Sequence, residues 1–515
     1  MMFRLKINIL TIFLLINSSI LICGETSKPN IETTKTKPEE TAPAKNTTVT
    51  EKPKVPNTLC TSCDCNSKSK TFDCSNRHLQ KLFTLKDWLS LNESGIAVDI
   101  MILSGNGIDN LTQFPPLDVK KLDLSYNNID TIENNAFQDL KSLEELNLSN
   151  NKLSSKSLTP TVFQGRFSAD LYEPIKELKI LNLGGNLLHT LHPDIFEHFP
   201  KLEVLILESN PFKAIDVGTE SAIAGIYTLR SLDLSYMELS KLPEHIFHSP
   251  SGLQVLNLTG NLLTEVPNSL SYARNLKQLI LDENPMRNFT DKNVFPEMKS
   301  LEYLSLSYIH TLQEIGKGAF SGLTNLREMH LDNNYALSKI DELAFAHADP
   351  ENPERKDWPP VKKLYLHNDK LEYLHPHLLA RWDDMETIDI RSNPWSCDCD
   401  NQWMLIALLP IIEEKTSKSL PYIKCASPEE FRGKNFTELE EEHTHLRCRD
   451  YYGNNPRRDS AILIGLLIGF CIGIPLTLAA LFLYKRGCFG LIGNRGPADY
   501  SRAFYKRASN DDFHI

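Results

Sequence analysis

The chain has 515 residues, of which 41% are hydrophobic and 23% charged, and its formal net charge at pH 7 is -11. At about 100–200 residues per domain, this length accommodates three or four ordinary globular units. The excess of 66 acidic over 55 basic residues argues against a nucleic-acid-binding protein, because such proteins need a concentrated basic surface. The hydrophobic residues are unevenly distributed, with one long apolar run toward each end of the sequence.

The first apolar run covers residues 7–22 and follows a short basic segment. This arrangement, with the small residue Gly24 after the run, is typical of a secretory signal peptide, which we predict over residues 1–24. A signal anchor is the alternative, but the run is short for a membrane span and polar residues interrupt it. Residues 25–57 are rich in Thr, Pro, Lys and Glu and contain no aromatic residue, so they predict a disordered stalk.

The second apolar run, Ala461–Leu483, contains no charged residue. Because about 20 helical residues cross a bilayer core, it predicts a transmembrane helix over residues 461–484, between a juxtamembrane linker (450–460) and a cytoplasmic tail (485–515). The signal peptide places the upstream side outside the cell, which predicts a single-pass type I protein of the plasma membrane with an extracellular N-terminus. Seven N-x-S/T glycosylation sequons lie on that side: Asn46, Asn92, Asn110, Asn147, Asn257, Asn288 and Asn435.

Eight of the 11 cysteines form two groups of four upstream of the span. They are Cys60, Cys63, Cys65 and Cys74 in the first group, and Cys397, Cys399, Cys425 and Cys448 in the second. An even number in an oxidising compartment predicts disulfide bonds. A zinc site is the alternative, but the C-x-C spacing and the secretory context argue against it. Two disulfide-bonded units therefore bracket a long segment without cysteine.

One pattern, L-x-x-L-x-L-x-x-N-x-L, recurs about twelve times over residues 98–395. The repeats begin at residues 98, 119, 143, 178, 202, 229, 253, 276, 301, 326, 361 and 385. The fourth and sixth positions point the same way from an extended strand, so both enter a core that one repeat of about 24 residues cannot form alone. The pattern predicts an α/β-type solenoid of leucine-rich repeats.

The same pattern leads to expectations for the segments between the strands. The Asn at the ninth position can bond backbone groups of the turn that leaves each strand, but three repeats carry Met237, Ile309 or Asp369 there. Two longer repeats insert polar segments, Ser154–Lys176 and His347–Pro360, which we expect as loops at a rim or on the convex side. These insertions are binding elements or tolerated insertions. An aromatic spine is expected from five residues: Phe137, Phe196, Phe247, Phe320 and Phe345.

The two cysteine groups resemble the caps of a known family, the extracellular leucine-rich-repeat proteins. The spacing Cys60-x-x-Cys63-x-Cys65-x8-Cys74 is similar to their N-terminal cap, and Asn393-Pro394-Trp395-x-Cys397-Asp398-Cys399 is similar to their C-terminal cap. The resemblance implies a curved horseshoe with a parallel concave sheet between caps over residues 58–97 and 396–449. It also implies four disulfide bonds: Cys60–Cys65, Cys63–Cys74, Cys397–Cys425 and Cys399–Cys448.

The sequence contains no G-x-S-x-G, H-E-x-x-H, G-x-x-x-x-G-K or glycine-rich dinucleotide motif. We therefore expect no enzymatic activity, no catalytic residue, no cofactor and no metal site. His443 and His445 beside Glu440, Glu441 and Glu442 are the alternative case for a metal, and we interpret them as a solvated acidic run.

A repeat scaffold without a catalytic motif predicts a cell-surface recognition protein, an adhesion protein or co-receptor that binds an extracellular protein ligand. The alternatives are a membrane-bound regulator of a signalling pathway, acting by ligand sequestration or receptor association, and a shed matrix-type binding protein. The third, fifth and seventh positions face the concave surface, where Asn147 and Asn257 would carry glycans. Repeats eight to eleven have no sequon on that face and display residues suited to a protein interface: Asp282, Tyr303, Ser305, His330, Asp332, Tyr365 and His367.

The C-terminal part suggests further partners. Gly465, Gly469 and Gly473 recur every four residues and favour a homodimer through the transmembrane helix, although glycine is also common in unpaired spans. The ending, with Phe513 and Ile515, resembles class II ligands of PDZ domains, which would capture the free carboxylate. Cys488 is a candidate for palmitoylation or an inert thiol.

Overall fold

The computed structural model of the protein describes residues 59–93, 96–168, 171–290, 293–348, 352, 355–416, 422–449 and 463–485. The predicted signal peptide, stalk and linker lie outside these residues. The same holds for residues 486–515 of the predicted tail, which include Cys488, Phe513 and Ile515.

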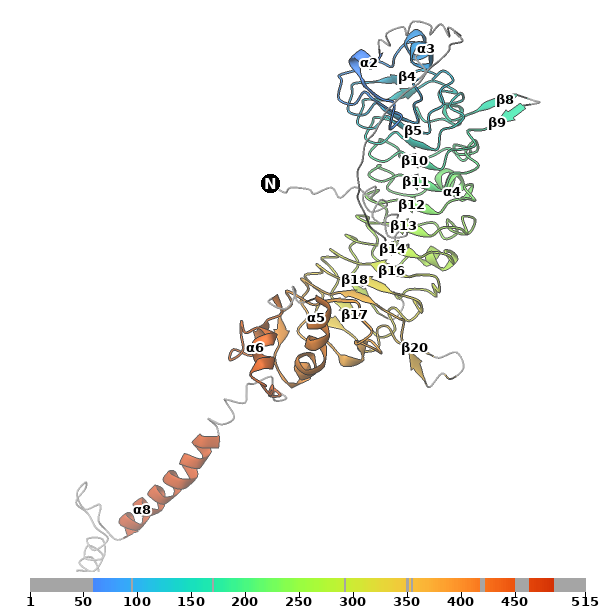
Figure 1. The fold of residues 1–515 in the computed structure, drawn as a ribbon. Coiled ribbons are helices and arrows are strands. Elements are labelled where there is room, and N and C mark those ends of the chain that lie inside the picture. Colours follow the sequence, from blue (N-terminus) through green and yellow to red (C-terminus); the bar gives the residue numbers. More distant parts are fainter. Residues whose placement is uncertain are drawn as a thin grey trace, which may run out of the picture. The chain divides into compact units, whose positions relative to one another are not determined.

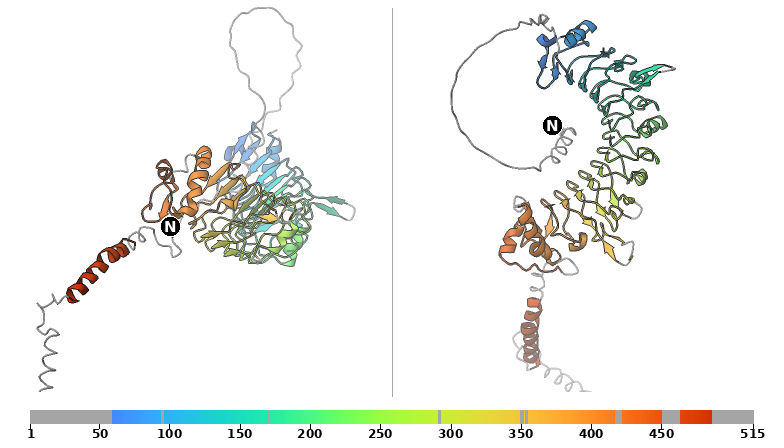
Figure 2. Two further views of the ribbon diagram at one scale, coloured as in Figure 1. Left: turned by 90° about the horizontal axis from the view of Figure 1, so that it is seen from below. Right: turned by 45° about the vertical axis from the view of Figure 1, so that its right-hand side comes forward.

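One sheet of 14 strands runs through the repeats (Figure 1). Its strands are β1 (Asp64–Asn66), β2 (Thr71–Asp73), β3 (Ile100–Ile102), β5 (Lys121–Asp123), β7 (Glu145–Asn147), β10 (Ile180–Asn182), β11 (Val204–Ile206), β12 (Ser231–Asp233), β13 (Val255–Asn257), β14 (Gln278–Ile280), β16 (Tyr303–Ser305), β18 (Glu328–His330), β22 (Lys363–Tyr365) and β23 (Thr387–Asp389). All neighbours from β2 to β23 pair in parallel, and only β1 and β2 pair antiparallel. The right-hand view of Figure 2 shows these repeats stacked in an arc.

The strands lie where the repeat pattern places them. Each repeat strand from β3 onward begins two residues after a predicted repeat start, so its middle residue is the apolar fourth position. In register, Leu181 of β10 pairs with Leu205 of β11, which pairs with Leu232 of β12, and all three are fully buried. This register and burial confirm the predicted leucine-rich-repeat solenoid with a parallel sheet. Each repeat buries its leucines against those of the neighbouring repeats.

The Asn at the ninth position forms a ladder of hydrogen bonds between repeats, which is interrupted where Met237, Ile309 or Asp369 occupies that position. The Nδ2 group of Asn127 donates to the backbone carbonyls of Leu103 in the preceding repeat and Leu124 in its own repeat, both at 3.0 Å. Its Oδ1 accepts from the backbone N–H of Ile108 at 3.2 Å. Asn210 makes the equivalent bonds three repeats later. These amides satisfy buried backbone groups in each turn, as the pattern predicted.

The eighth position of every repeat has a left-handed backbone conformation, which the pattern did not reveal. At this position the residues with positive φ are Gly105, Tyr126, Asn150, Gly185, Ser209, Tyr236, Gly260, Glu283, Tyr308, Asn333, Asn368 and Ser392. The backbone N–H at this position donates to the seventh-position carbonyl of the next repeat, for example from Tyr308 to Asp332. This bond extends the sheet ladder by one residue and fixes the turn.

The return segments behind the sheet contain short elements. Small parallel sheets consist of β4 (Asn110–Leu111) with β6 (Thr131–Ile132), and of β15 (Asn288–Phe289), β17 (Glu314–Ile315) and β19 (Lys339–Ile340). The helical turns are η1 (Pro160–Val162), α4 (Val217–Ala224), η2 (Asn268–Tyr272) and η3 (Pro376–Leu378). Each long insertion contains a β-hairpin, namely β8 (Arg166–Ser168) with β9 (Leu171–Glu173), and β20 (His347–Ala348) with β21 (Lys356–Asp357).

The aromatic spine is interrupted, unlike the predicted continuous row. One part runs from Phe114 through Phe137 and Phe163 to Phe199, with ring centroids 5.1–6.0 Å apart. Another part joins rings in later repeats: Phe289, Phe295, Phe320 and Phe345. Phe247 is fully buried between the two parts and belongs to neither of them. Aliphatic side chains fill the intervening repeats, so the spine does not depend on one residue type.

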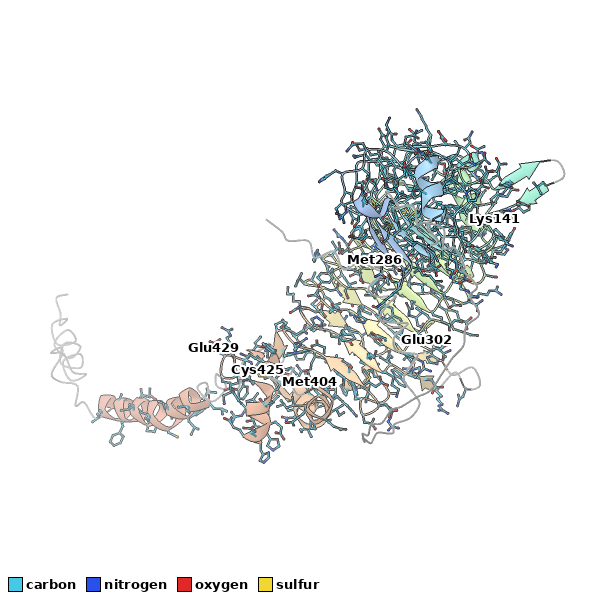
Figure 3. The ribbon with its side chains drawn as sticks, turned by 45° about the horizontal axis from the view of Figure 1, so that its top comes forward. Lys141, Met286, Glu302, Met404, Cys425 and Glu429 are labelled. Atoms are coloured by element: carbon cyan, nitrogen blue, oxygen red, sulfur yellow. A yellow bond between two sulfur atoms is a disulfide. The ribbon has the colours of Figure 1, made fainter. Side chains whose placement is uncertain are left out.

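Disulfide-bonded caps close both ends of the repeats. The N-terminal cap contains α2 (Leu59–Ser62), β1, β2 and α3 (Leu85–Glu93), and the C-terminal cap contains β24 (Trp395–Ser396), η4 (Cys399–Asn401), η5 (Met404–Leu408), α5 (Leu409–Thr416), β25 (Cys425–Ser427) and α6 (Phe436–Glu441). Figure 3 labels Met404 and Cys425 in this second cap. The four disulfides have the pairing that the resemblance implies: Cys60–Cys65, Cys63–Cys74, Cys397–Cys425 and Cys399–Cys448.

One helix among the described residues, Leu463–Leu483, has the length and hydropathy needed to cross a membrane. It comprises a π-helical segment, η7 (Gly469–Gly473), followed by α8 (Ile474–Lys485). All three glycines of the predicted pairing face, Gly465, Gly469 and Gly473, lie within it.

Candidate ligand-binding surface

The concave face of the sheet brings together the seven residues predicted as a binding surface. They lie in, or two residues beyond, four successive strands, β14, β16, β18 and β22, which are neighbours in the sheet. In register, Ser305 lies beside His330 and His330 beside Tyr365. Because alternate residues of a strand face the same side, these side chains form one continuous surface.

An aromatic stack lies at the centre of this surface. The His330 and Tyr365 rings are parallel within 15°, with centroids 4.2 Å apart. Tyr303 lies on the other side of His330, at a centroid distance of 5.2 Å. Burial raises the pKa of both tyrosine hydroxyls, so they are neutral donors and acceptors at physiological pH. The three rings therefore offer an amphipathic contact area of the kind that protein interfaces use, with His330 and Tyr365 stacked and Tyr303 tilted by 42° against His330.

His330 is held in place by two carboxylates. Its Nε2 lies 2.9 Å from Glu328 Oε1, and its Nδ1 lies 3.5 Å from Asp332 Oδ1. Burial alone would lower the pKa of His330, but the interactions with Asp332 and Glu328 outweigh burial and raise it to about 9. The imidazole is therefore a cation at neutral pH. A charged ring stacked on Tyr365 adds a cation–π contact to the surface.

Acidic and hydroxyl groups form the base of the same surface. Ser305 Oγ donates to Asp282 Oδ1 at 2.7 Å, and the backbone N–H of Ser307 donates to the same oxygen at 2.8 Å. Ser307 Oγ donates to Asp332 Oδ1 at 3.0 Å. Burial raises the pKa of Asp282 to about 6 despite these bonds. Ser305 and Asp332 are buried, so they support the network rather than offering contact area to a ligand.

His367 extends the cluster toward the C-terminal cap through residues that the sequence reasoning missed. Its Nδ1 lies 3.3 Å from Asp389 Oδ2, and its Nε2 lies 3.8 Å from Asp332 Oδ2. Arg391 pairs with Asp389 through two hydrogen bonds of 2.8 and 2.6 Å. Lys363 pairs with Glu328 at 3.0 Å. All four missed residues occupy third, fifth or seventh positions, so taking every such position and including the twelfth repeat would have found them.

A band of aliphatic residues on the concave face was also missed. Ile180, Val204 and Val255 occupy the third position of their repeats, while Ile206 and Ile280 occupy the fifth. Four of them are half-buried and Ile206 is buried. The polar strand β12 interrupts the band, and the aromatic stack continues it beyond β14. The concave face thus changes from aliphatic to aromatic and charged along the repeats.

The structure places the sequons in different environments. Asn110 and Asn288 are exposed on return-segment strands, and Asn147 is half-buried on the concave face. Asn257 is buried, and its Nδ2, the atom that would carry a glycan, donates to Asp233 Oδ2 at 3.1 Å. Asn435 precedes α6 and donates to Glu438 Oε1. The remaining two sequon side chains, Asn46 and Asn92, lie outside the described part.

Among the described residues, Glu342, His375 and His377 bring three possible metal ligands within 4.8 Å of one another. Hydrogen bonds hold the side chains of this exposed group close to one another. The backbone N–H of His377 donates to His375 Nδ1 at 3.2 Å, so the neutral ring carries its proton on Nε2. That nitrogen lies 3.0 Å from Glu342 Oε2 and can donate a hydrogen bond to it.

Comparisons with known proteins agree with the repeat structure. The chain matches the family described as leucine rich repeat over residues 97–153, 173–212, 228–286 and 288–336, and a second description of the same repeat covers residues 142–165. Tsukushi of Gallus gallus is 32% identical over 44% of this chain and 57% of its own length. CD180 antigen of Mus musculus is 26% identical over 66% of this chain and 46% of its own length.

Leucine-rich repeat transmembrane protein FLRT2 of Mus musculus is 26% identical over 43% of this chain and 35% of its own length. The chain therefore spans less than two thirds of each of these relatives. The matched residues are those of the repeats, and the strands, the asparagine ladder and the paired caps are present together in the structure. The chain contains leucine-rich repeats over the matched residues, and these repeats lie between two disulfide-bonded caps.

Proposed function

We propose that the protein is a cell-surface recognition molecule, an adhesion protein or co-receptor, that binds an extracellular protein ligand on the C-terminal half of its concave face. The observation that carries this proposal is the stack of Tyr303, His330 and Tyr365 on three neighbouring strands. Tyrosine rings with a polar edge supply large contact areas at a low entropic penalty, which suits protein interfaces better than small-molecule sites.

The ion pairs around the stack favour a rigid, preorganised surface. His330, Glu328 and Lys363 are linked by contacts of 2.9 and 3.0 Å, so their side chains are already ordered before a ligand arrives. A ligand then loses less free energy in ordering the interface. The stack also lies six to eight repeats beyond the concave sequon Asn147, so a glycan there would leave it accessible.

Type I orientation in the plasma membrane is part of the proposal. The helix Leu463–Leu483 would span the bilayer, and the cysteine-rich caps and sequons would lie outside the cell. One relative, FLRT2, is itself named a leucine-rich repeat transmembrane protein. On the cytoplasmic side, the free C-terminal carboxylate with Phe513 and Ile515 would recruit a PDZ-domain scaffold, and the spaced glycines would support a homodimer.

The test is a screen of secreted and cell-surface proteins against cells that display the full-length chain. The proposal expects at least one protein to bind these cells and not untransfected cells. Clustering with cells that express the bound protein would identify adhesion, and binding in the same membrane would identify a signalling regulator. Absence of any binding, at normal surface expression, would contradict the proposal.

A further inference from the structure

Three tyrosines occupy the left-handed eighth position, where glycine or asparagine is favoured. Tyr126, Tyr236 and Tyr308 have φ angles of 54°, 53° and 59°. A bulky side chain is strained in this conformation, because its Cβ approaches the neighbouring carbonyl oxygen. All three side chains are nevertheless exposed, by 56%, 46% and 45%, so burial does not compensate the strain. The left-handed conformation is imposed by the turn that every repeat makes at this position, and these three tyrosines extend from it into solvent.

Two of these tyrosines belong to one stretch of the sheet edge. Tyr236 in the sixth repeat extends over Gly260 in the seventh, where a Cβ atom would approach the tyrosine ring to 2.3 Å. The Tyr236 hydroxyl then donates to Glu283 Oε1 in the eighth repeat at 3.0 Å. The ring is therefore held flat along the edge across three repeats, with a carboxylate at its far end.

The same edge continues with further aromatic side chains. Tyr308 in the ninth repeat is followed two residues later by His310, whose ring stacks on Tyr335 of the tenth repeat at 5.5 Å and 11°. Tyr335 is 58% exposed and Leu262, at the same position of the seventh repeat, is 51% exposed. We name this set the aromatic edge: Tyr236, Leu262, Glu283, Tyr308, His310 and Tyr335.

The charge of the aromatic edge is acidic. Positions eight and ten of the sixth to tenth repeats carry two carboxylates, Glu238 and Glu283, and neither Lys nor Arg. Glu238 makes only a distant pair with Lys213, at 4.0 Å between exposed side chains. Flat aromatic rings beside carboxylates are the environment that a planar guanidinium group recognises, because it stacks on the rings and pairs with the acids.

We infer that the aromatic edge is a docking surface, separate from the concave stack, for a protein partner that presents exposed arginine side chains. Arginine rather than lysine fits the flat rings, since only its guanidinium group can stack and form paired hydrogen bonds at once. The aromatic residues that follow one another from the sixth to the tenth repeat are the reason to assign this edge, since Tyr126 is the one aromatic residue at position eight or ten of the first five repeats. The inference rests on the proposed recognition function but names a different surface.

The test uses full-length protein in lipid nanodiscs and fluorescein-labelled peptides of alternating arginine and glycine, followed by anisotropy at physiological salt. The variant combines Tyr236→Asn, Tyr308→Asn and Tyr335→Asn. Asparagine already occupies position eight at Asn150 and position ten at Asn128, so the variant retains a residue that the fold accepts. We expect its dissociation constant to rise about tenfold, as for loss of several cation–π contacts, while its unfolding temperature rises because strain is removed.

Matched controls distinguish peptide binding at the aromatic edge from a general attraction of the basic peptide to acidic residues elsewhere on the protein. Tyr126→Asn with Tyr227→Asn removes two exposed tyrosines outside the aromatic edge and should leave the dissociation constant unchanged. A peptide with citrulline in place of arginine keeps the shape without the charge and should bind weakly. The inference would be overturned if the triple variant kept the wild-type affinity or if the control variant lost as much affinity as the triple variant. It would also be overturned if the citrulline peptide bound as well as the arginine peptide, or if the arginine peptide did not bind the wild-type protein. These outcomes do not depend on the ligand of the concave stack, so the two proposals can fail separately.

Discussion

Asp369 accepts through Oδ1 a hydrogen bond of 2.7 Å from the backbone N–H of Asn334, one repeat earlier. It occupies the ninth position, where Asn334 and most other repeats use an amide that also donates. Its Oδ2 is buried and has no hydrogen-bond partner among the described residues. Burial raises the pKa of Asp369 to about 9, so the carboxyl is protonated at neutral pH. A protonated acid can donate from Oδ2, as the amide of Asn does in the ladder.

Asp369→Asn should therefore stabilise the protein and reduce its pH dependence. The folded pKa is raised from the ordinary value of 3.8, so the stabilisation from the bound proton is fully present below about pH 4 and is lost as the pH rises toward 9. An amide does not titrate, so we expect the variant to gain on the order of 2 kcal/mol at pH 8. Thermal unfolding between pH 5 and 9 measures this. Asp118→Asn, on an exposed side chain, is the control, and equal curves for Asp369→Asn and wild type would disprove the role of the proton.

The asparagine ladder predicts opposite outcomes for two adjacent residues. Asn127→Ala removes the partner of the Ile108 N–H and of two carbonyls, leaving buried backbone groups unsatisfied. We expect a loss of about 2 kcal/mol in the free energy of unfolding. Asn128 is exposed at the tenth position, so Asn128→Ala should change stability by less than about 0.5 kcal/mol. Denaturant unfolding of both variants checks this, and similar losses would refute the ladder argument.

The repeat strands could be predicted from sequence because one physical requirement recurs in every repeat. Leu181, Leu205 and Leu232 must be buried against each other, and this fixes strand, register and stacking together. The fold class and the turn asparagines follow from the same repetition. The left-handed eighth position could not be read from the template, because Tyr126 and Tyr236 stand where glycine or asparagine would have signalled it.

The candidate site was only partly predictable. The alternation of side chains along each strand placed Tyr303, His330 and Tyr365 on one face. It did not predict the distances between their rings, which make them a stack. Nor did it distinguish a side chain that offers contact area from one such as Ser305, whose hydroxyl is buried against Asp282. Such distinctions depend on side-chain packing between strands, which a one-dimensional pattern does not specify.

Glycosylation should differ between the two concave sequons. Asn257 is buried and its Nδ2 is bonded to Asp233, whereas Asn147 is half-buried and its Oδ1 accepts from the Ser149 N–H at 3.0 Å. We expect glycopeptide mass spectrometry of the cell-surface protein to find Asn257 unoccupied, with Asn288 as the exposed positive control. A glycan at Asn257 in the folded protein would mean that the Asp233–Asn257 contact does not form.

Capture of the C-terminus by a PDZ domain would require a free terminal carboxylate and the side chains of Phe513 and Ile515. A tail peptide should therefore retain PDZ-domain proteins, and the same peptide with one glycine added after Ile515 should lose them. The added residue displaces the carboxylate without removing either side chain. Equal retention by both peptides would exclude carboxylate capture.

The central claim is that the concave aromatic stack binds the ligand. The most direct measurement is the binding of a protein identified in the cell-surface screen to cells that display full-length wild type or Tyr303→Ala with Tyr365→Ala. Loss of two central tyrosines should weaken binding by about 100-fold at equal surface expression. Tyr126→Ala with Tyr227→Ala, outside the concave face, should bind as wild type does. Wild-type affinity in the Tyr303→Ala, Tyr365→Ala variant would contradict the account.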